Sequence, residues 1–205
     1  CIRDRDIPII ECADYMENTP LGRAEWIRFI GLFTGRESQA DSLFATIERQ
    51  YIKLCQRVSR IKNRPTVISE KKTGSTWFVP GGNSYMARLF ADAGVDYFWK
   101  DDKHAGSLAL SFESVFDKAQ SADFWLFKYS APTDITLRTL ASEHSPYSRF
   151  IAFEKGRVFG CNLTRNRFFE EVPLHPDLLL KDFILIFHPE LFPGERCRYY
   201  HHLQP

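Results

Sequence analysis

The order of apolar patterns after Pro65 limits the fold more than any other feature of this 205-residue chain. Short β-branched and aromatic runs, typical of buried strands, alternate with amphipathic runs of helical spacing. This order is typical of helices that cover a mainly parallel sheet. We predict strands over residues 66–70, 95–99, 123–129, 148–153 and 156–161, and helices over residues 84–92, 111–122, 133–142 and 176–187. The sequence therefore predicts an α/β fold with a mainly parallel sheet flanked by helices.

The expected helices carry recognisable end signals. Ser111 can cap a helix whose first turn contains Glu113, and Thr133 or Asp134 can cap the next helix. Gly94 is suited to end the expected helix over residues 84–92. The two expected strands around residues 154–156 form either a hairpin or a strand–turn–strand unit.

A long amphipathic pattern occupies residues 36–64, before the alternating region. Its apolar residues recur in steps of three and four, which predicts a helix of roughly 40 Å. They include Leu43, Ile47, Tyr51, Leu54 and Val58. Two interpretations stay open: a surface helix of a larger α/β domain, or a helix that joins two lobes.

The first 35 residues contain less structure. Thr19 and Pro20 give a helix start, and Gly35 gives its end. Residues 7–12 are apolar and predict a short buried strand that lacks a neighbouring strand in the residues around it.

Charge and cysteine content exclude some classes of function. The formal net charge is +1, which gives no electrostatic argument for binding nucleic acid or an anionic membrane. The five cysteines form no CxxC pair and no zinc spacing, so one disulfide and free thiols both stay possible.

The segment "STWFVPGGNS", residues 75–84, is the most distinctive candidate for ligand binding. We expect it to be a loop that follows the strand over residues 66–70, because ligands of open α/β sheets bind beyond the carboxyl ends of strands. Trp77, Phe78 and Tyr85 would offer flat apolar surface, and the helix start at Asn83 and Ser84 would offer unpaired N–H groups to an anion or a carbonyl. The segment matches neither a P-loop nor GxGxxG.

Aromatic, amide and guanidinium groups recur where the other expected strands end. Aromatic faces stack on rings, and guanidinium groups pair with carboxylates or phosphates, so this rim suits a large, flat or anionic ligand. The candidate contacts at these strand ends are Tyr97, Trp99, Tyr129, Asn162, Arg165 and Arg167.

The sequence lacks a recognisable catalytic constellation. Its six histidines have no metal-helix spacing, and no nucleophile elbow or Cys/His signature occurs. We expect the terminal His201–His202 pair to be disordered. We therefore predict no enzymatic activity, no metal site and no intrinsic cofactor. The alternative is an α/β enzyme or a ligand-sensing domain that holds an anionic metabolite in the turn at residues 81–84.

Several segments, in their order along the chain, resemble class III periplasmic substrate-binding proteins of ABC importers. This family includes receptors for ferric siderophores, haem and cobalamin. The segments are "IPIIE", "TPLGRAEWIRFIGLFTG", "GNSYMARLFADAGVDY", "LSFESVFDKAQSADFWLF" and "HPDLLLKDFILIFHPELF". The chain is similar to the C-terminal portion of such a protein.

The resemblance implies a division of the chain into three parts. Residues 1–35 would end an N-terminal lobe that is otherwise missing, residues 36–64 would form the helix between the lobes, and residues 65–205 would form the C-terminal α/β lobe. The ligand would lie between the lobes and would be an iron chelate, haem or a corrinoid.

The resemblance also implies partners and a location. The protein would be a monomer in the periplasm, anchored by lipid, if at all, through a cysteine upstream of this fragment rather than Cys1. It would deliver its ligand to the transmembrane subunits of an ABC permease. Glu113 matches the family's acidic docking residue in the Leu-Ser-x-Glu segment. The resemblance implies no nucleic-acid partner.

Overall fold

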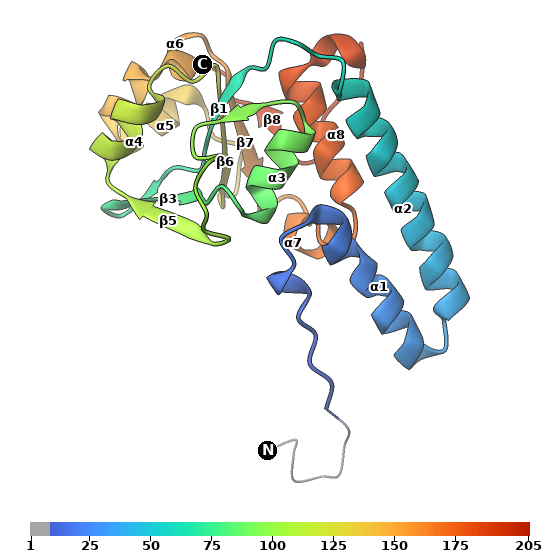
Figure 1. Cartoon of the computed structure of the whole chain (residues 1–205). Helices are drawn as coiled ribbons and strands as arrows, with labels where there is room; N and C mark the ends of the chain where they lie inside the picture. Colours follow the sequence, from blue (N-terminus) through green and yellow to red (C-terminus); the bar gives the residue numbers. More distant parts are fainter. Residues whose placement is uncertain (1–8) are drawn as a thin grey trace.

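A computed structural model describes residues 9–205, and a five-stranded sheet forms its centre (Figure 1). The strand order is β4-β1-β6-β7-β8, and all neighbours are parallel except β8, which runs antiparallel to β7. The strands are β1 (Thr66–Ser69), β4 (Asp96–Tyr97), β6 (Phe124–Tyr129), β7 (Val158–Asn162) and β8 (His201–His202). The predicted α/β fold with a mainly parallel sheet is confirmed.

Helices lie against this sheet, and side-chain caps start three of them. The hydroxyls of Ser84, Ser111 and Thr136 accept hydrogen bonds from backbone N–H groups in the first turn. The expected cap at Thr133 or Asp134 is therefore wrong by two or three residues. The helices are α3 (Tyr85–Asp92), α4 (Phe112–Ala119), α5 (Leu137–Glu143), α7 (Phe168–Glu171) and α8 (Pro176–Phe187).

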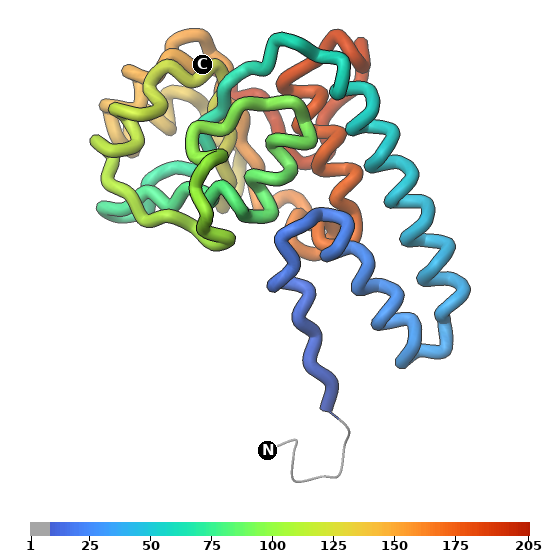
Figure 2. The backbone as a smooth tube through the Cα atoms, viewed as in Figure 1, coloured from blue at the N-terminus to red at the C-terminus, as the bar shows by residue number. Residues whose placement is uncertain are grey.

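Two longer helices, α1 (Pro20–Thr34) and α2 (Glu37–Val58), run antiparallel beside the sheet domain (Figure 2). Thr19 caps α1, and Gly35 ends it in the left-handed conformation, as predicted. Helix α2 ends six residues earlier than predicted. The chain must turn into β1, and the residue before Pro65 is restricted to extended conformations.

Half of the segment predicted to be a loop at residues 75–84 is a strand. β3 (Thr76–Pro80) pairs antiparallel with β2 (Lys72–Thr73) and with β5 (Ser107–Leu110) in a second, three-stranded sheet. The loop interpretation was wrong because the strand has only five residues, ends at Pro80, and lies between Gly74 and the Gly81–Gly82 pair. Strand β5 was not predicted.

Three further expectations at the segment level are wrong. Residues 148–153 form the 3₁₀ helix η3 (Ser145–Arg149) and α6 (Ile151–Glu154), because the parallel strands β6 and β7 need a crossover rather than a hairpin. The His201–His202 pair is ordered as β8. The strand expected over residues 7–12 is not formed at residues 9–12, and no strand among residues 9–205 lies beside them. Residues 7 and 8 lie outside the part of the chain that the structure describes.

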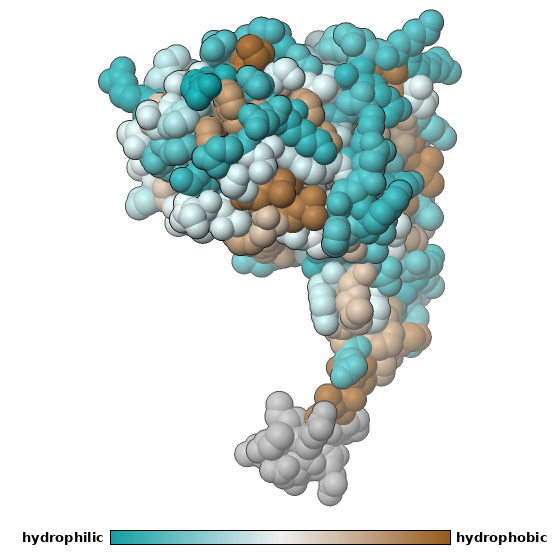
Figure 3. Space-filling view, turned by 60° about the vertical axis from the view of Figure 1, so that its left-hand side comes forward, coloured by the Kyte–Doolittle hydropathy of each residue, from teal (hydrophilic) through white to brown (hydrophobic). Residues whose placement is uncertain are grey.

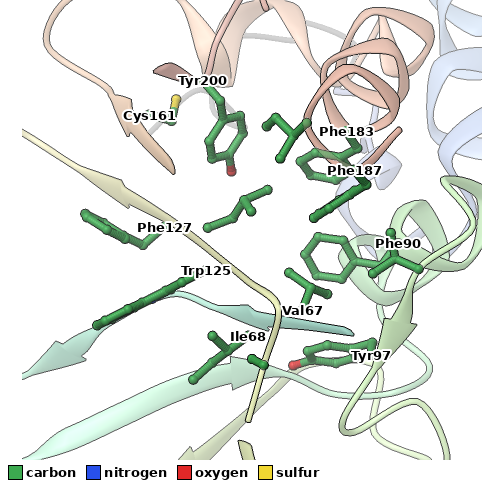
Figure 4. Packing of buried hydrophobic residues seen from close by; sticks show 14 of the residues in the cluster. Val67, Ile68, Phe90, Tyr97, Trp125, Phe127, Cys161, Phe183, Phe187 and Tyr200 are labelled. Carbon is green, nitrogen blue, oxygen red and sulfur yellow. The ribbon is translucent and has the colours of Figure 1, made fainter. Parts of the chain in front are cut away.

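Apolar side chains from both faces of the sheet fill the core (Figure 4). Val67 of β1 and Phe90 of α3 lie beside Tyr97, and Phe90 stacks on Phe183 of α8 with 5.1 Å between ring centroids. Helix α8 is buried on nearly all sides, which explains its apolar sequence.

One buried carboxylate attaches the C-terminal segment to this core. Asp182 of α8 is 2% exposed and accepts hydrogen bonds from the backbone N–H groups of Arg198, Tyr199 and Tyr200. Burial raises the pKa of Asp182 to about 6, while these three donors oppose that rise. The contacts place the chain for β8.

A close backbone approach at Gly82 generates a stability prediction. A Cβ at this position would lie 2.4 Å from the carbonyl oxygens of Asp102 and Trp99, so Gly82→Ala must displace backbone. We expect it to lower the free energy of unfolding by about 1–3 kcal/mol, measured by urea unfolding. Gly106→Ala is the matched control, because the methyl group that it adds would point into open space, with nothing within 4 Å. Equal midpoints for the two variants would contradict this account.

Candidate functional site

A hollow of about 370 Å³ opens at the carboxyl ends of β1 and β6, where α/β sheets bind ligands. We call it the strand-end hollow. Its lining comes from the β1–β2 connection, from β2 and β3, from the start of α3, from β5 and the residues before it, and from β6. The lining residues are Glu70, Lys71, Thr73, Phe78, Pro80, Ser84, Tyr85, Met86, Ala105, Gly106, Ser107 and Lys128.

The charged part of the hollow depends on Glu70, which has a left-handed backbone conformation with φ of 64°. Non-glycine residues adopt this conformation at a cost, so surrounding contacts must hold it. Glu70 donates its N–H to the Leu126 carbonyl, and its carboxylate forms an ion pair with Lys128. Lys71 pairs with Glu143 in the same region. Both lysines at this edge are therefore paired with carboxylates.

The apolar part of the hollow has one exposed ring and one anchored ring. Phe78 is 47% exposed. The Tyr85 hydroxyl donates to the Val172 carbonyl at 3.4 Å, and the Arg23 guanidinium lies 5.6 Å from the Tyr85 ring centroid. Burial raises the pKa of Tyr85. The hollow therefore combines apolar surface with paired charges.

Three of the predicted ligand contacts line this hollow: Phe78, Ser84 and Tyr85. The Ser84 side chain is already engaged, because its hydroxyl accepts a hydrogen bond from the Ala87 N–H as the cap of α3. Phe78 and Tyr85 present the larger surfaces.

Three predicted rim residues lie in the core instead. Trp77 is fully buried, and its indole N–H donates to the Ser69 carbonyl at 3.0 Å. Tyr97 is 3% exposed and donates its hydroxyl to the Pro80 carbonyl, and Trp99 is 5% exposed. The predicted location was wrong because large aromatic rings at short strands fill the space between the sheets and helices.

The other predicted residues form a separate group beyond β6 and β7. Asn162 donates its amide to Asp134, and Tyr129 hydrogen-bonds Asp134 and the His201 ring. Arg165 pairs with Asp134 at 3.4 Å. Arg167 is exposed and precedes α7. None of these four residues lines the strand-end hollow.

The turn at residues 81–84 has little capacity to cradle an anion. The N–H groups of Gly81 and Asn83 donate to the carbonyls of Gly106 and His104, and the Ser84 N–H donates to the Gly81 carbonyl. These backbone donors are used within the fold, so the cradle in the alternative enzyme interpretation has no support here.

Sequence reasoning missed Glu70, Lys71, Met86 and Lys128. The rule that ligands bind after strand ends applied to Glu70 and Lys71, which directly follow β1. They were overlooked because isolated charged residues at a strand end resemble ordinary surface residues.

Chemically reactive groups are sparse in the described chain. Within residues 9–205, no three His, Cys, Asp or Glu side chains are placed to hold a metal ion. Cys12, Cys55, Cys161 and Cys197 are free thiols, and Cys1 lies outside the described residues. No helix in this range combines the length and the apolar character that crossing a bilayer requires.

The predicted docking residue Glu113 is exposed in the first turn of α4. Its own backbone N–H and the Ser111 hydroxyl hold the pKa of this carboxyl below its usual value. The side chain is therefore an ionised group on the surface.

Comparison with known proteins identifies relatives in sequence and in structure. The model of the "Periplasmic binding protein" family matches residues 2–162. Two proteins of Methanocaldococcus jannaschii named "Uncharacterized lipoprotein" are 31% and 25% identical over 97% and 99% of this chain. The chain covers 46% and 52% of their lengths, so it spans about half of these curated relatives.

Solved structures share the fold. The TroA-like periplasmic binding protein FepB of Veillonella parvula has a TM-score of 0.69 and 19% identity, covering 93% of this chain and 63% of that chain. S. aureus IsdE complexed with heme has a TM-score of 0.62 and 17% identity, covering 83% and 66%. At these identities the likeness concerns the fold alone.

Trp77 and Phe78 are adjacent in β3 but differ in burial, and this difference predicts unequal effects on stability. Trp77→Ala removes a fully buried indole, and we expect it to lower the free energy of unfolding by about 3–5 kcal/mol. Phe78→Ala removes a half-exposed ring and should change it by less than about 1 kcal/mol. Urea unfolding of both variants checks this. A small effect at Trp77 would show that its indole is not a core contact.

Proposed function

The chain belongs to the periplasmic binding protein family, and on that premise we propose that it captures a solute outside the cytoplasmic membrane and delivers it to an ABC permease. The family and the structural neighbours are substrate-binding proteins, not enzymes. The observation that carries the proposal is the strand-end hollow, which combines a half-exposed Phe78 with Lys71 and Lys128 at the edge of the sheet.

The chemistry of the hollow supports an anionic ligand with an apolar or flat part. Lys128 already pairs with Glu70, but its ammonium group has three N–H donors and can also donate to a carboxylate or hydroxamate oxygen. Phe78 can stack on a ring. We propose an iron chelate, haem or a corrinoid as the ligand class. The heme bound to S. aureus IsdE supports a metal complex, although that protein shares only 17% identity with this chain.

We propose that a second lobe completes the ligand site. Residues 1–35 would end that lobe, residues 36–64 would connect it, and residues 65–205 would form the lobe described above. Helix α1 carries Ile30, Leu32 and Phe33 at 43%, 60% and 57% exposure, an apolar surface suited to packing against further protein. Ile9 and Ile10 are likewise exposed. Figure 3 shows hydrophobic surface along the narrow lower part of the molecule. The length of the curated relatives supports this division.

We also propose a periplasmic location, with a lipid anchor on an upstream cysteine of the longer protein. The relatives named as lipoproteins support this. The binding protein would act as a monomer on its permease.

Ligand titration of the full-length protein tests the proposal. Ferrichrome, haemin and cyanocobalamin are the probes, and tryptophan fluorescence is the readout. We expect one probe to bind, and Lys128→Gln to weaken it about tenfold or more through loss of a charge-assisted contact. Phe78→Ala should weaken it several-fold. Ile52→Ala, which removes a similarly exposed apolar side chain on α2, is the control. Binding of none of the three probes would contradict the ligand class, and unchanged affinity in both variants would contradict the site.

Glu113 gives a separate prediction about delivery. We expect Glu113→Arg to reduce ligand uptake through the permease in proteoliposomes while leaving ligand affinity in solution unchanged, because it reverses the charge that would meet permease arginines. Glu154→Arg, at an exposed position of α6, is the control for charge alone. Normal uptake with Glu113→Arg would show that docking does not use this residue.

A further inference from the structure

A larger hollow, of about 760 Å³, lies between α2 and α8, the neighbouring helices at the right of Figure 1. We call it the α2–α8 groove. It shares no lining residue with the strand-end hollow. Its lining residues are Gln50, Lys53, Leu54, Gln56, Arg57, Arg60, Asp177, Leu178, Lys181, Leu191 and Phe192.

Basic side chains dominate the wall that α2 and its C-terminal continuation contribute. Lys53 and Arg57 are four residues apart and lie on one side of α2, and Arg60 follows two residues after the helix ends at Val58. Within residues 9–205, Lys181 pairs with Glu195, whereas no ion pair joins the other three cations to a carboxylate. The groove therefore carries positive charge that the described chain does not neutralise.

Apolar side chains lie next to these cations. Leu54, Leu191 and Phe192 line the groove, and the Arg57 guanidinium lies 4.6 Å from the Phe192 ring centroid. A guanidinium stacked on a ring keeps its in-plane N–H groups free to pair with a phosphate. The lining is thus suited to a molecule with an anionic and an apolar part.

A buried acceptor also lines the groove without a partner. Asp177 is 4% exposed, and its Oδ1 accepts no hydrogen bond within the described residues. The His175 Nδ1 is 3.9 Å from that oxygen, which exceeds hydrogen-bond distance. Burial raises the pKa of Asp177. An unpaired buried acceptor is costly, so a donor from a bound molecule would stabilise the site.

We propose that the α2–α8 groove binds the headgroup of an anionic phospholipid that carries a hydroxyl group. Lys53, Arg57 and Arg60 pair with the phosphate. Leu191 and Phe192 contact the first apolar carbons. The headgroup hydroxyl donates to Asp177 Oδ1. This site would place the α2–α8 side of the protein on a membrane surface, independently of the ligand in the strand-end hollow.

Cations near a helix C-terminus stabilise the helix through its dipole, but this effect does not account for the cations, the apolar lining and the unpaired Asp177 oxygen together. Arg57 lies in the last turn of α2 and favours the helix dipole there. Lys53 lies more than a turn before the end of α2, and neither the apolar lining nor the unpartnered Asp177 oxygen follows from the dipole.

Vesicle flotation tests the proposal with the full-length protein produced without lipid modification. The vesicles contain either phosphatidylcholine alone or phosphatidylcholine with one third phosphatidylglycerol. We expect binding only to the anionic vesicles. Basic residues near such a surface attract anionic lipids, so Arg57→Glu with Arg60→Glu should weaken binding at least about tenfold. The control, Arg49→Glu, lies on α2 outside the groove and should retain binding to within a few-fold.

A second comparison tests the role of Asp177. Phosphatidylmethanol has the charge of phosphatidylglycerol but no hydroxyl group. We expect Asp177→Leu, which removes the acceptor, to abolish a several-fold preference of the wild-type protein for phosphatidylglycerol over phosphatidylmethanol vesicles, because the loss of the carboxylate charge affects both anionic lipids alike. Circular dichroism melts confirm that each variant is folded.

Three results would overturn the proposal. The first is no binding of the wild-type protein to phosphatidylglycerol vesicles. The second is equal loss in the groove variant and in Arg49→Glu, which would indicate diffuse surface charge. The third is saturation of the groove by soluble glycerol 1-phosphate without any vesicle binding, which would indicate a site for free phosphates.

Discussion

Two stacked tryptophans hold the small antiparallel sheet against the end of the central sheet. Trp77 of β3 and Trp125 of β6 have ring centroids 5.6 Å apart. Their indole N–H groups donate to consecutive carbonyls at the end of β1, Trp77 to Ser69 at 3.0 Å and Trp125 to Glu70 at 2.7 Å. Buried indoles whose N–H groups are satisfied provide large apolar contact without an unpaired donor. The position of β3, and with it the wall of the strand-end hollow, depends on this pair.

The same contacts explain the conformation of Glu70. Its carbonyl is held by Trp125, its N–H by Leu126, and its carboxylate by Lys128. These three contacts hold the residue in the left-handed region, which turns the chain out of β1 and into β2. Trp77 points into the core and the next residue, Phe78, points to solvent, as alternation along a strand requires. The aromatic core therefore fixes both the charged and the apolar part of the hollow.

Local signals in the sequence predicted the parts of the fold that local chemistry determines. The caps at Thr19 and Ser111 and the end of α1 at Gly35 were predicted because one side chain or one backbone conformation decides each. The strand β3 was not, because alternation over five residues is a weak signal beside flanking glycines and a proline. The burial of Tyr97 and Trp99 depends on which distant segments pack against them, and local sequence spacing does not encode these tertiary contacts. Phe78 and Tyr85 were predicted because ligands of α/β sheets bind beyond the ends of strands. Lys71 and Lys128, which line the same hollow, belong to no recognisable motif.

The distribution of charge shows a related limit of composition. A net charge of +1 gave no reason to expect an anion-binding surface. The structure separates the charges: Lys53, Arg57 and Arg60 line the α2–α8 groove, while Glu17, Glu25, Glu37 and Asp41 gather at a hollow beside α1. Fields of exposed charges fade over a Debye length of about 8 Å at physiological salt. A molecule at the groove therefore responds mainly to the cations around it rather than to the sum over the chain, so local placement decides which ligands each surface can attract.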